Sequence, residues 1–315
     1  MSTVRPRATV LGGAAMALAN VILGASSLYW RALSHVSPTA LLGYRILISL
    51  VTLGVALAVL KRIKPVFDAA FNGRLLLLHL MAAVLVSANW LTFIWGSVHG
   101  HVLETGLGYL IAPAVTIVLG AGVMRERLDP VRVVALVLCL IGIILLIARS
   151  HELEWWVYVT IGTTWGIYSF LKKLTTADPF TGLTLETAIL AVGVGVAILA
   201  STYSLAPGPD ADTSDFVLLA LCGVVSVTPL WLISFGAKKI TLSTAGFLQY
   251  VLPTTQLVVA LVFYGQQPSG NTLVSYATVW LSLILILVYP LLHTRRAGNT
   301  ATKPPALAED RRAGP

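Results

Sequence analysis

Ten long apolar stretches constrain what this 315-residue chain can fold into. They cover residues 9–30, 39–60, 75–96, 102–123, 131–148, 155–171, 181–203, 215–236, 243–264 and 272–293. A helix needs about 20 mostly apolar residues to cross the ~30 Å hydrocarbon core of a bilayer, because each residue rises ~1.5 Å. Strands of a membrane barrel would instead alternate apolar and polar residues. The pattern therefore predicts an all-α polytopic membrane protein with ten transmembrane helices.

The composition excludes the soluble classes of protein. Only 11% of the residues are charged and 57% are hydrophobic, with a mean hydropathy of +0.86. Average soluble domains carry ~25% charged residues, so this chain has less than half of the usual supply for a water-facing surface. Two cysteines are too few for a disulfide-rich secreted scaffold. The lipid bilayer is the solvent that this composition fits.

The distribution of the basic residues predicts an orientation. If both termini are cytoplasmic and the ten spans alternate, 18 of the 21 Lys and Arg fall on the inner side and only Arg31 and Arg149 in outer loops. This asymmetry follows the positive-inside rule. We therefore expect an inner (plasma) membrane protein, with residues 1–8 as a cytoplasmic N-terminus and the polar residues 294–315 as a disordered cytoplasmic tail. The net charge of +8 then reports topology, and no nucleic-acid partner is expected.

The second half of the chain repeats the first at an offset of about 140 residues. Matching positions are Gly96 and Gly236, Gly106 and Gly246, and Pro113 and Pro253. We expect one five-helix repeat over 9–148 and another over 155–293. Because five is odd, the second repeat is inverted in the membrane relative to the first. Inverted repeats are a recurrent transporter architecture, with the substrate site near the midplane between them.

Three segments carry a resemblance to a known family. They are LYWRALSHVSPTALLGYRILIS (28–49), NWLTFIWGSVHGHVLETGLGYLIAP (89–113) and TPLWLISFGAKKITLSTAGFLQYVLPT (228–254). Over roughly residues 8–293 the chain resembles the RarD-type branch of the EamA transporters, in the drug/metabolite transporter superfamily. The resemblance implies ten helices in two inverted five-helix repeats. It also implies a permease, of a kind often linked to drug resistance or metabolite export.

The chain departs from the pattern of that branch at two places. Acidic and histidine positions ahead of the arginine in the second helix read Ala40 and Tyr44. The Gly-Glu pairs that often close the fourth and ninth helices read Arg125-Glu126 and Gly265-Gln266. A proton-coupling scheme built on those positions would lack its acidic groups.

Three charged residues lie within the spans: Arg45, Glu104 and Glu186, besides Arg132 and Asp215 at span ends. Such residues cost roughly 2.5–3.5 kcal/mol on insertion scales and tend to face a cavity or a partner. Arg45 lies near the outer side and Glu186 near the inner side, so we expect no direct bridge between them.

We expect Glu104 as the partner of Arg45. For Glu186 we expect either Lys238 or Lys239, or no partner and titration. Two interpretations stay open for these charges. Either Arg45 meets an anionic group of a solute and Glu186 a cation or proton, or the charges form structural pairs near the interfaces.

Two prolines are expected to kink their helices near the middle. Pro113 and Pro253 remove a backbone hydrogen bond and would free the carbonyls of Tyr109 and Gln249. Tyr109, Gln249, Tyr250 and Gln256 are therefore candidates for lining a pocket, against the alternative of a packing kink. Asn89 and Trp90, deep in the third span, are further candidates for substrate contact, Asn89 because an amide in hydrocarbon needs a partner.

No catalytic or metal-binding motif occurs in the sequence, so we expect neither a cofactor nor a metal. The sequence predicts an inner-membrane secondary transporter, a permease or exporter, that moves a small organic metabolite or drug-like solute by alternating access. Its expected partners are that solute, membrane lipid and a proton as candidate coupling ion, with a homodimer left open. The alternative is a membrane-embedded enzyme or lipid-handling protein that acts on headgroups.

Overall fold

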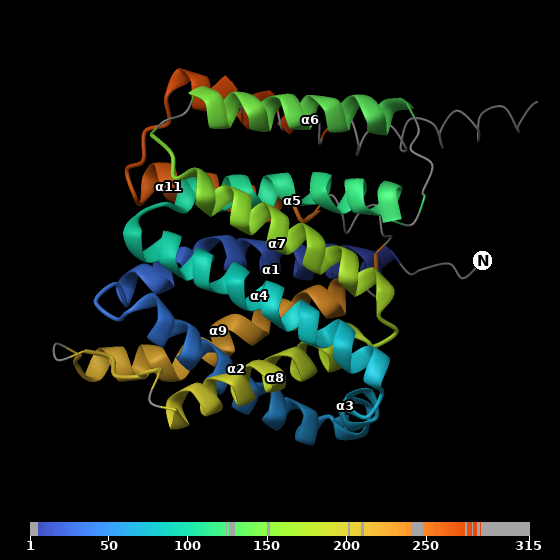
Figure 1. The fold of residues 1–315 in the computed structure, drawn as a ribbon, viewed down its shortest axis with the longest axis vertical. Coiled ribbons are helices and arrows are strands. Elements are labelled where there is room, and N and C mark those ends of the chain that lie inside the picture. Colours follow the sequence, from blue (N-terminus) through green and yellow to red (C-terminus); the bar gives the residue numbers. More distant parts are fainter. Residues whose placement is uncertain are drawn as a thin grey trace, which may run out of the picture.

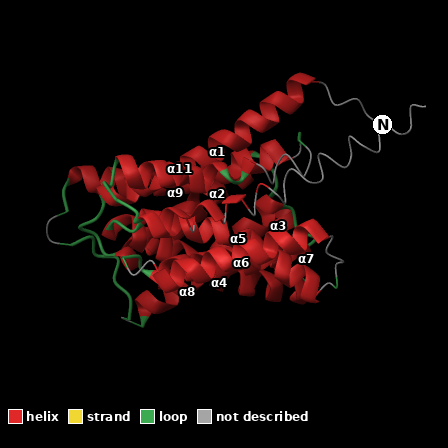
Figure 2. Ribbon diagram, turned by 90° about the horizontal axis from the view of Figure 1, so that it is seen from above, coloured by secondary structure: helices red, strands yellow, loops and turns green. Residues whose placement is uncertain are grey.

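The chain is helical throughout the part that the computed structural model describes, which holds no strand. That part comprises residues 6–123, 125, 130–149, 152–200, 202–208, 211–237, 239–240, 248–274, 276–278, 280–281 and 284. The helices are α1 (Pro6–Ala32), α2 (Pro38–Val59), α3 (Ile63–Ala70), α4 (Gly73–His99), α5 (Val102–Val123), α6 (Pro130–Arg149), α7 (Trp155–Leu174), α8 (Pro179–Leu199), α9 (Thr213–Ala237) and α11 (Val251–Val262). The long helices run along a common direction in layers (Figure 1), and loops gather at the two ends (Figure 2).

Among the described residues, six helices are long and apolar enough to cross a bilayer: α1, α2, α4, α5, α8 and α9. Their outward faces carry exposed aliphatic side chains such as Val55, Val84 and Val196. Apolar side chains on the outside of a helix bundle are stable against lipid tails, which confirms the multi-pass membrane class. The last two expected spans, 243–264 and 272–293, lie partly outside the described residues, so the count of ten stays a prediction.

The second helix of each half begins in the same way. Pro38 follows Ser37, whose hydroxyl accepts a hydrogen bond from the Ala40 amide. Pro179 follows Asp178, whose carboxylate accepts from the backbone amides that open α8. Proline at the first helical position costs no hydrogen bond, and a capping oxygen satisfies otherwise free amides. The sequence repeat therefore includes a repeated helix start.

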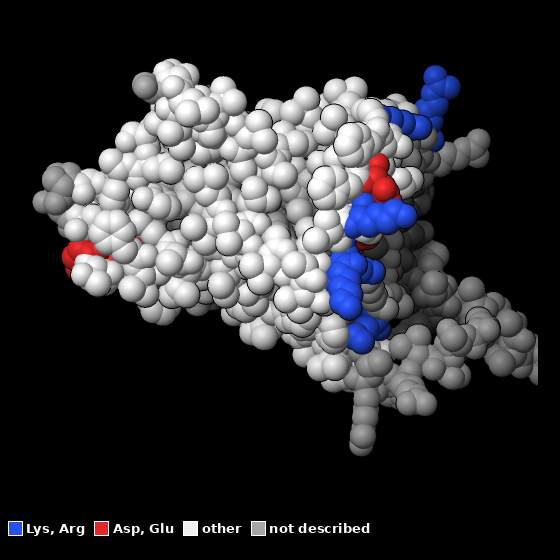
Figure 3. Space-filling model, turned by 90° about the horizontal axis from the view of Figure 1, so that it is seen from below, with Lys and Arg blue, Asp and Glu red and all other residues white. Residues whose placement is uncertain are grey.

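Helix α3 is a short element that the apolar stretches do not predict. It packs against α4 and α8, and Ile63, Phe67 and the following Phe71 stay exposed. Exposed Lys and Arg surround it, and Figure 3 shows that basic residues gather along one end of the molecule. The exposed acids Glu152 and Glu154 directly precede α7, whose first turn lies at the opposite end (Figure 1). A short helix with apolar and basic side chains suits the boundary between lipid and water.

Helix contacts between the two halves occur in matching pairs. Helix α7 packs on α5 and α4, and α1 packs on α11 and α9. Helix α2 packs on α9, and α8 packs on α4. Exchanging α1 with α7, α2 with α8, α4 with α9 and α5 with α11 turns each of these contacts into another one. The helix contacts at the centre are therefore the same from the side of either half.

At two of these matching contacts, a glycine lets the helix backbones approach closely. A Cβ at Gly24 in α1 would lie 2.7 Å from Thr255 Cβ and 2.8 Å from the Leu252 carbonyl oxygen. A Cβ at Gly166 in α7 would lie 2.6 Å from Val115 Cβ and 2.8 Å from the Ala112 carbonyl oxygen. The contacted positions differ by 140 in both cases. Small residues let membrane helices approach to backbone contact.

Substituting either glycine by alanine should destabilise the protein. A methyl group there must displace helix backbone, at a cost of about 1–3 kcal/mol, which outweighs the gain of up to about 1 kcal/mol in helix propensity. Gly193→Ala is the matched control, because Gly193 is exposed on α8 with open space around its Cα. In thermal unfolding of detergent-purified protein we expect Gly24→Ala and Gly166→Ala to unfold earlier than Gly193→Ala. Equal unfolding temperatures for all three would contradict the close approach.

Candidate functional site

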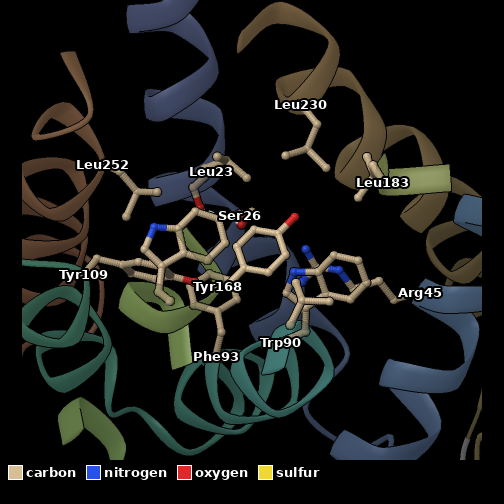
Figure 4. A pocket seen from close by; sticks show the side chains of 12 residues that line it. Leu23, Ser26, Arg45, Trp90, Phe93, Tyr109, Tyr168, Leu183, Leu230 and Leu252 are labelled. Carbon is tan, nitrogen blue, oxygen red and sulfur yellow. Dashed lines mark hydrogen bonds between the residues drawn. The ribbon is translucent and has the colours of Figure 1, made fainter. Parts of the chain in front are cut away.

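A cavity lies between the two halves and receives side chains from eight helices. Its lining residues are Leu23, Ser26, Arg45, Val86, Trp90, Phe93, Tyr109, Trp165, Tyr168, Leu183, Leu230 and Leu252. The empty space amounts to about 560 Å³, the space at its mouth included. Five lining residues are aromatic and one, Arg45, is charged. In Figure 4, Arg45 and Trp90 lie at one end, whereas Tyr109 and Leu252 lie at the other.

Arg45 extends from α2 into this cavity and is held by aromatic rings. Its guanidinium carbon lies 4.2 Å from the centroid of the Trp90 ring and 5.4 Å from that of Trp30. Attraction between the cation and the electron-rich ring faces stabilises this placement. Arg45 and Trp90, two of the predicted site residues, therefore lie together at one end of the cavity.

Glu104 is not the partner of Arg45, contrary to expectation. It lies in the first turn of α5, where it accepts a hydrogen bond from Gln266 Nε2 at 3.0 Å and lies 2.8 Å from His101 Nδ1. The Gln266 side-chain carbonyl in turn accepts from the Leu103 amide. These contacts fasten the start of α5 to the segment after α11, and Glu104 does not line the cavity.

Tyr109 lines the cavity, and Asn89 supports it from behind. The Tyr109 hydroxyl donates to Asn89 Oδ1 at 2.9 Å, and the Asn89 amide nitrogen donates to Thr164 Oγ1 and to the Ile161 carbonyl of α7. Asn89 therefore holds Tyr109 in place from behind and ties α4 to α7. Its buried amide is fully used within the protein, as an amide in hydrocarbon requires.

Glu186 lies at the centre of a buried polar cluster. Its Oε1 lies 2.7 Å from both His79 Nδ1 and Lys172 Nζ, and its Oε2 accepts from the Tyr168 hydroxyl at 2.9 Å. His79 and Glu186 are almost completely buried. The expected partner Lys238 lies outside the described residues, and Lys239 lies over the Phe235 ring instead. Lys172, one of the 18 basic residues that the sequence assigns to the inner side, forms the ion pair with Glu186.

Tyr168 connects this cluster with two cavities. A second cavity is lined by Tyr168, Lys172, Pro179, Phe180, Leu183, Val227, Leu230, Trp231 and Ile233. Tyr168, Leu183 and Leu230 line both cavities. These three side chains therefore stand between the central cavity and the second one.

The two prolines take different positions in their helices. Pro113 lies inside α5, as expected, whereas the described part of α11 begins at Val251 and places Pro253 in its first turn. There a missing amide is harmless, and the Gln249 carbonyl accepts from the Leu252 amide. Gln249 and Tyr250 do not line the cavity.

Gln256 faces α5 instead of the cavity. It is completely buried and donates to Thr105 Oγ1 at 3.0 Å.

His79, Phe93, Trp165 and Tyr168 were missed by sequence reasoning. His79 left a readable signal, because a titratable side chain inside an apolar stretch needs a buried partner. The aromatic residues left no such signal in the sequence. An aromatic side chain in a span can face lipid, another helix or a cavity, and the sequence pattern is the same in all three cases.

Comparisons with known proteins identify the family. A model of the EamA-like transporter family matches residues 10–148. The chain is 32% identical over 287 residues to an uncharacterised transporter of Vibrio cholerae, covering 89% of this chain and 91% of that one. It is 31% identical over 273 residues to the uncharacterised transporter YojE of Bacillus subtilis, covering 85% and 91%. The chain belongs to the EamA-like transporter family.

Within this family the chain is of the RarD type. Protein RarD of Escherichia coli is 28% identical over 292 residues, with 91% of this chain and 97% of that one covered. A solved crystal structure with 16% identity superposes with a TM-score of 0.55 over 90% of this chain and 98% of that one, which supports the fold. This EamA-like protein is therefore a membrane transporter rather than an enzyme.

A pH test addresses the contact between His101 and Glu104 at the start of α5. The hydrogen bond to Glu104 raises the pKa of His101 above its ordinary value. A raised pKa means that the proton favours the folded state, so this stabilisation is complete below about pH 6.5 and is lost as the pH rises through the raised pKa. We expect the unfolding temperature to fall by a few degrees across that range. His101→Gln should flatten this dependence, whereas the control His99→Gln, at an exposed neighbour, should keep it.

Proposed function

We propose that this protein is an inner-membrane secondary transporter that carries a small organic solute through the central cavity by alternating access. The observation that carries the proposal is the cavity itself, which side chains of both halves enclose within a membrane transporter. A mostly apolar lining with a few polar groups that fix the orientation of a ligand is typical of binding sites for small molecules.

The matching helix contacts support two inverted repeats. The pairs α1–α11 and α5–α7, with Gly24 and Gly166 at equivalent contacts, are what a twofold relation between the halves requires. Such a relation gives two conformations of similar energy, each open to one side of the membrane. The solute would then stay at the centre while the two halves move around it.

The distribution of charge supports an orientation with the basic end in the cytoplasm (Figure 3). The second cavity, with Lys172 and the start of α8, then faces inward. At the outer end the Tyr264 hydroxyl lies 2.9 Å from the Ser27 carbonyl and 2.8 Å from the Ser97 carbonyl, tying α1 and α4 together. In this assignment the structure represents a state whose path leads to the cytoplasm.

Glu186 is the proposed coupling residue. Adding a proton to its carboxylate would remove the charge that Lys172 and His79 face, and change what the Tyr168 hydroxyl bonds to. Because Tyr168 stands between the cavities, a change in its bonding would alter access to the solute. A proton is thus the coupling ion that this cluster suits.

Filling the cavity tests the transport route. Ser26 lines it from α1, so Ser26→Trp should block flux of solute while the protein still reaches the membrane. Gly54→Trp is the control, because Gly54 is exposed on α2 with open space around it. Uptake and efflux of a labelled metabolite panel in proteoliposomes would measure the effect, expected to be at least about tenfold. Normal flux in Ser26→Trp would refute the route.

The coupling residue has its own test. Glu186→Gln keeps the size of the side chain but cannot exchange a proton near neutral pH, so we expect flux that no longer responds to an imposed pH gradient. Glu104→Gln, at a buried acid outside the cavity, is the matched control and should keep the response. An unchanged pH response in Glu186→Gln would rule out Glu186 as coupling site.

A further inference from the structure

Arg45 is a buried cation that no acidic side chain balances. It is 6% exposed, and in the described part of the chain it forms no salt bridge and its Nε has no hydrogen-bond partner. It is also the one charged residue among those that line the central cavity. The titratable groups that act on it electrostatically are Tyr29, Tyr109 and Cys222, which are uncharged at neutral pH.

The buried acids of the described residues are all occupied elsewhere. Glu104 is held by His101 and Gln266, and Glu186 by His79, Lys172 and Tyr168.

Asp215, near the outer end of α9, lies 2.8 Å from His35 Nε2. Each of these buried carboxylates therefore already has a hydrogen-bonded partner other than Arg45.

Near Arg45, a second hydrogen-bond donor lacks an acceptor among the described residues. The Trp30 indole nitrogen, in the ring whose centroid lies 5.4 Å from the guanidinium carbon, is buried and has no acceptor. The ring faces of Trp30 and Trp90 attract the cation but take up none of its N–H groups as a carboxylate would. A buried charge without a counter-ion is costly, so the cavity suits an acceptor that none of the described residues supplies.

We propose that the transported solute is an organic anion whose carboxylate binds Arg45 and whose apolar body packs against Phe93, Tyr109 and Trp165. This inference rests on the proposed function and names the substrate class of the same cavity. One guanidinium balances one negative charge, and its planar fork matches a carboxylate. A dianionic phosphate would leave a second charge uncompensated among aromatic rings, and a cationic solute would be repelled. The mono-carboxylate is therefore the group that the cavity fits.

Three probes that share one apolar body and differ in charge test whether binding depends on charge or on shape. They are 3-phenylpropanoate, 3-phenylpropanamide and 3-phenylpropylamine, which are anionic, neutral and cationic at neutral pH. Binding to the full-length purified protein is followed by quenching of tryptophan fluorescence, since Trp90 and Trp165 line the cavity. We expect the anion to bind at least about tenfold more tightly than the amide, because hydrogen bonds to charged groups are worth one to two powers of ten. The amine should bind more weakly still.

Three variants locate that preference. Arg45→Met should reduce binding of the anion to the level of the amide, and Arg45→Lys should keep part of the preference because the charge stays while the fork is lost. Arg31→Gln is the matched control: Arg31 also lies over an aromatic ring, that of Tyr264 at 4.4 Å, but is exposed and outside the cavity. Its preference should equal that of the wild type. If Arg45→Met does not fold, the reduced preference of Arg45→Lys for the anion provides the test instead.

The outcomes distinguish this inference from the proposed function. Equal binding of the three probes, abolished by Ser26→Trp, would overturn the anion assignment and keep the cavity as the solute site. A preference for the anion that persists in Arg45→Met would overturn the assignment in the same way. No binding of any probe to the wild type would also overturn the assignment, and normal metabolite flux in Ser26→Trp would then remove the proposed function too.

Discussion

Every polar group that enters the hydrocarbon must find its partner within the protein, and the centre of this structure depends on that constraint. Asn89 and Glu186 each lie on one helix and bond to side chains of another, and Glu104 bonds to the segment after α11. These bonds fix how the helices rotate about their axes, which apolar packing against lipid would leave open.

Arg45 departs from that rule, and it does so as a charged group that lines the cavity. Two tryptophan rings lie beside the guanidinium, but no carboxylate of the described residues pairs with it. A transporter that neutralised this charge permanently would gain nothing by binding an anion there. A site left electrostatically incomplete instead favours whichever solute completes it, and such differential affinity is what moves an equilibrium between conformations.

The sequence predicts the elements well and their partners poorly. Lengths of apolar stretches and the paired starts at Pro38 and Pro179 place the long helices from α1 to α9 to within a few residues. Among the candidates, Arg45, Trp90 and Tyr109 line the central cavity, and charge, aromaticity and helix depth are readable along the chain. The assignment of Glu104 to Arg45 is wrong because depth says nothing about the angle at which a side chain leaves its helix. Lys172 could not be told from an ordinary basic residue at a helix end for the same reason.

The close contacts at Gly24 and Gly166 have a consequence for how the two halves share work. Each joins one helix to the backbone of another with no side chain between them, so each can act as a pivot without rotamer rearrangement. Under the proposed alternating access, adding bulk at one of these glycines alone would favour one of the inward-open and outward-open conformations over the other. Adding bulk at both would restore the balance between the two conformations at a cost in stability. The proposed twofold relation thus makes a functional pair of two positions that are 142 residues apart in the sequence.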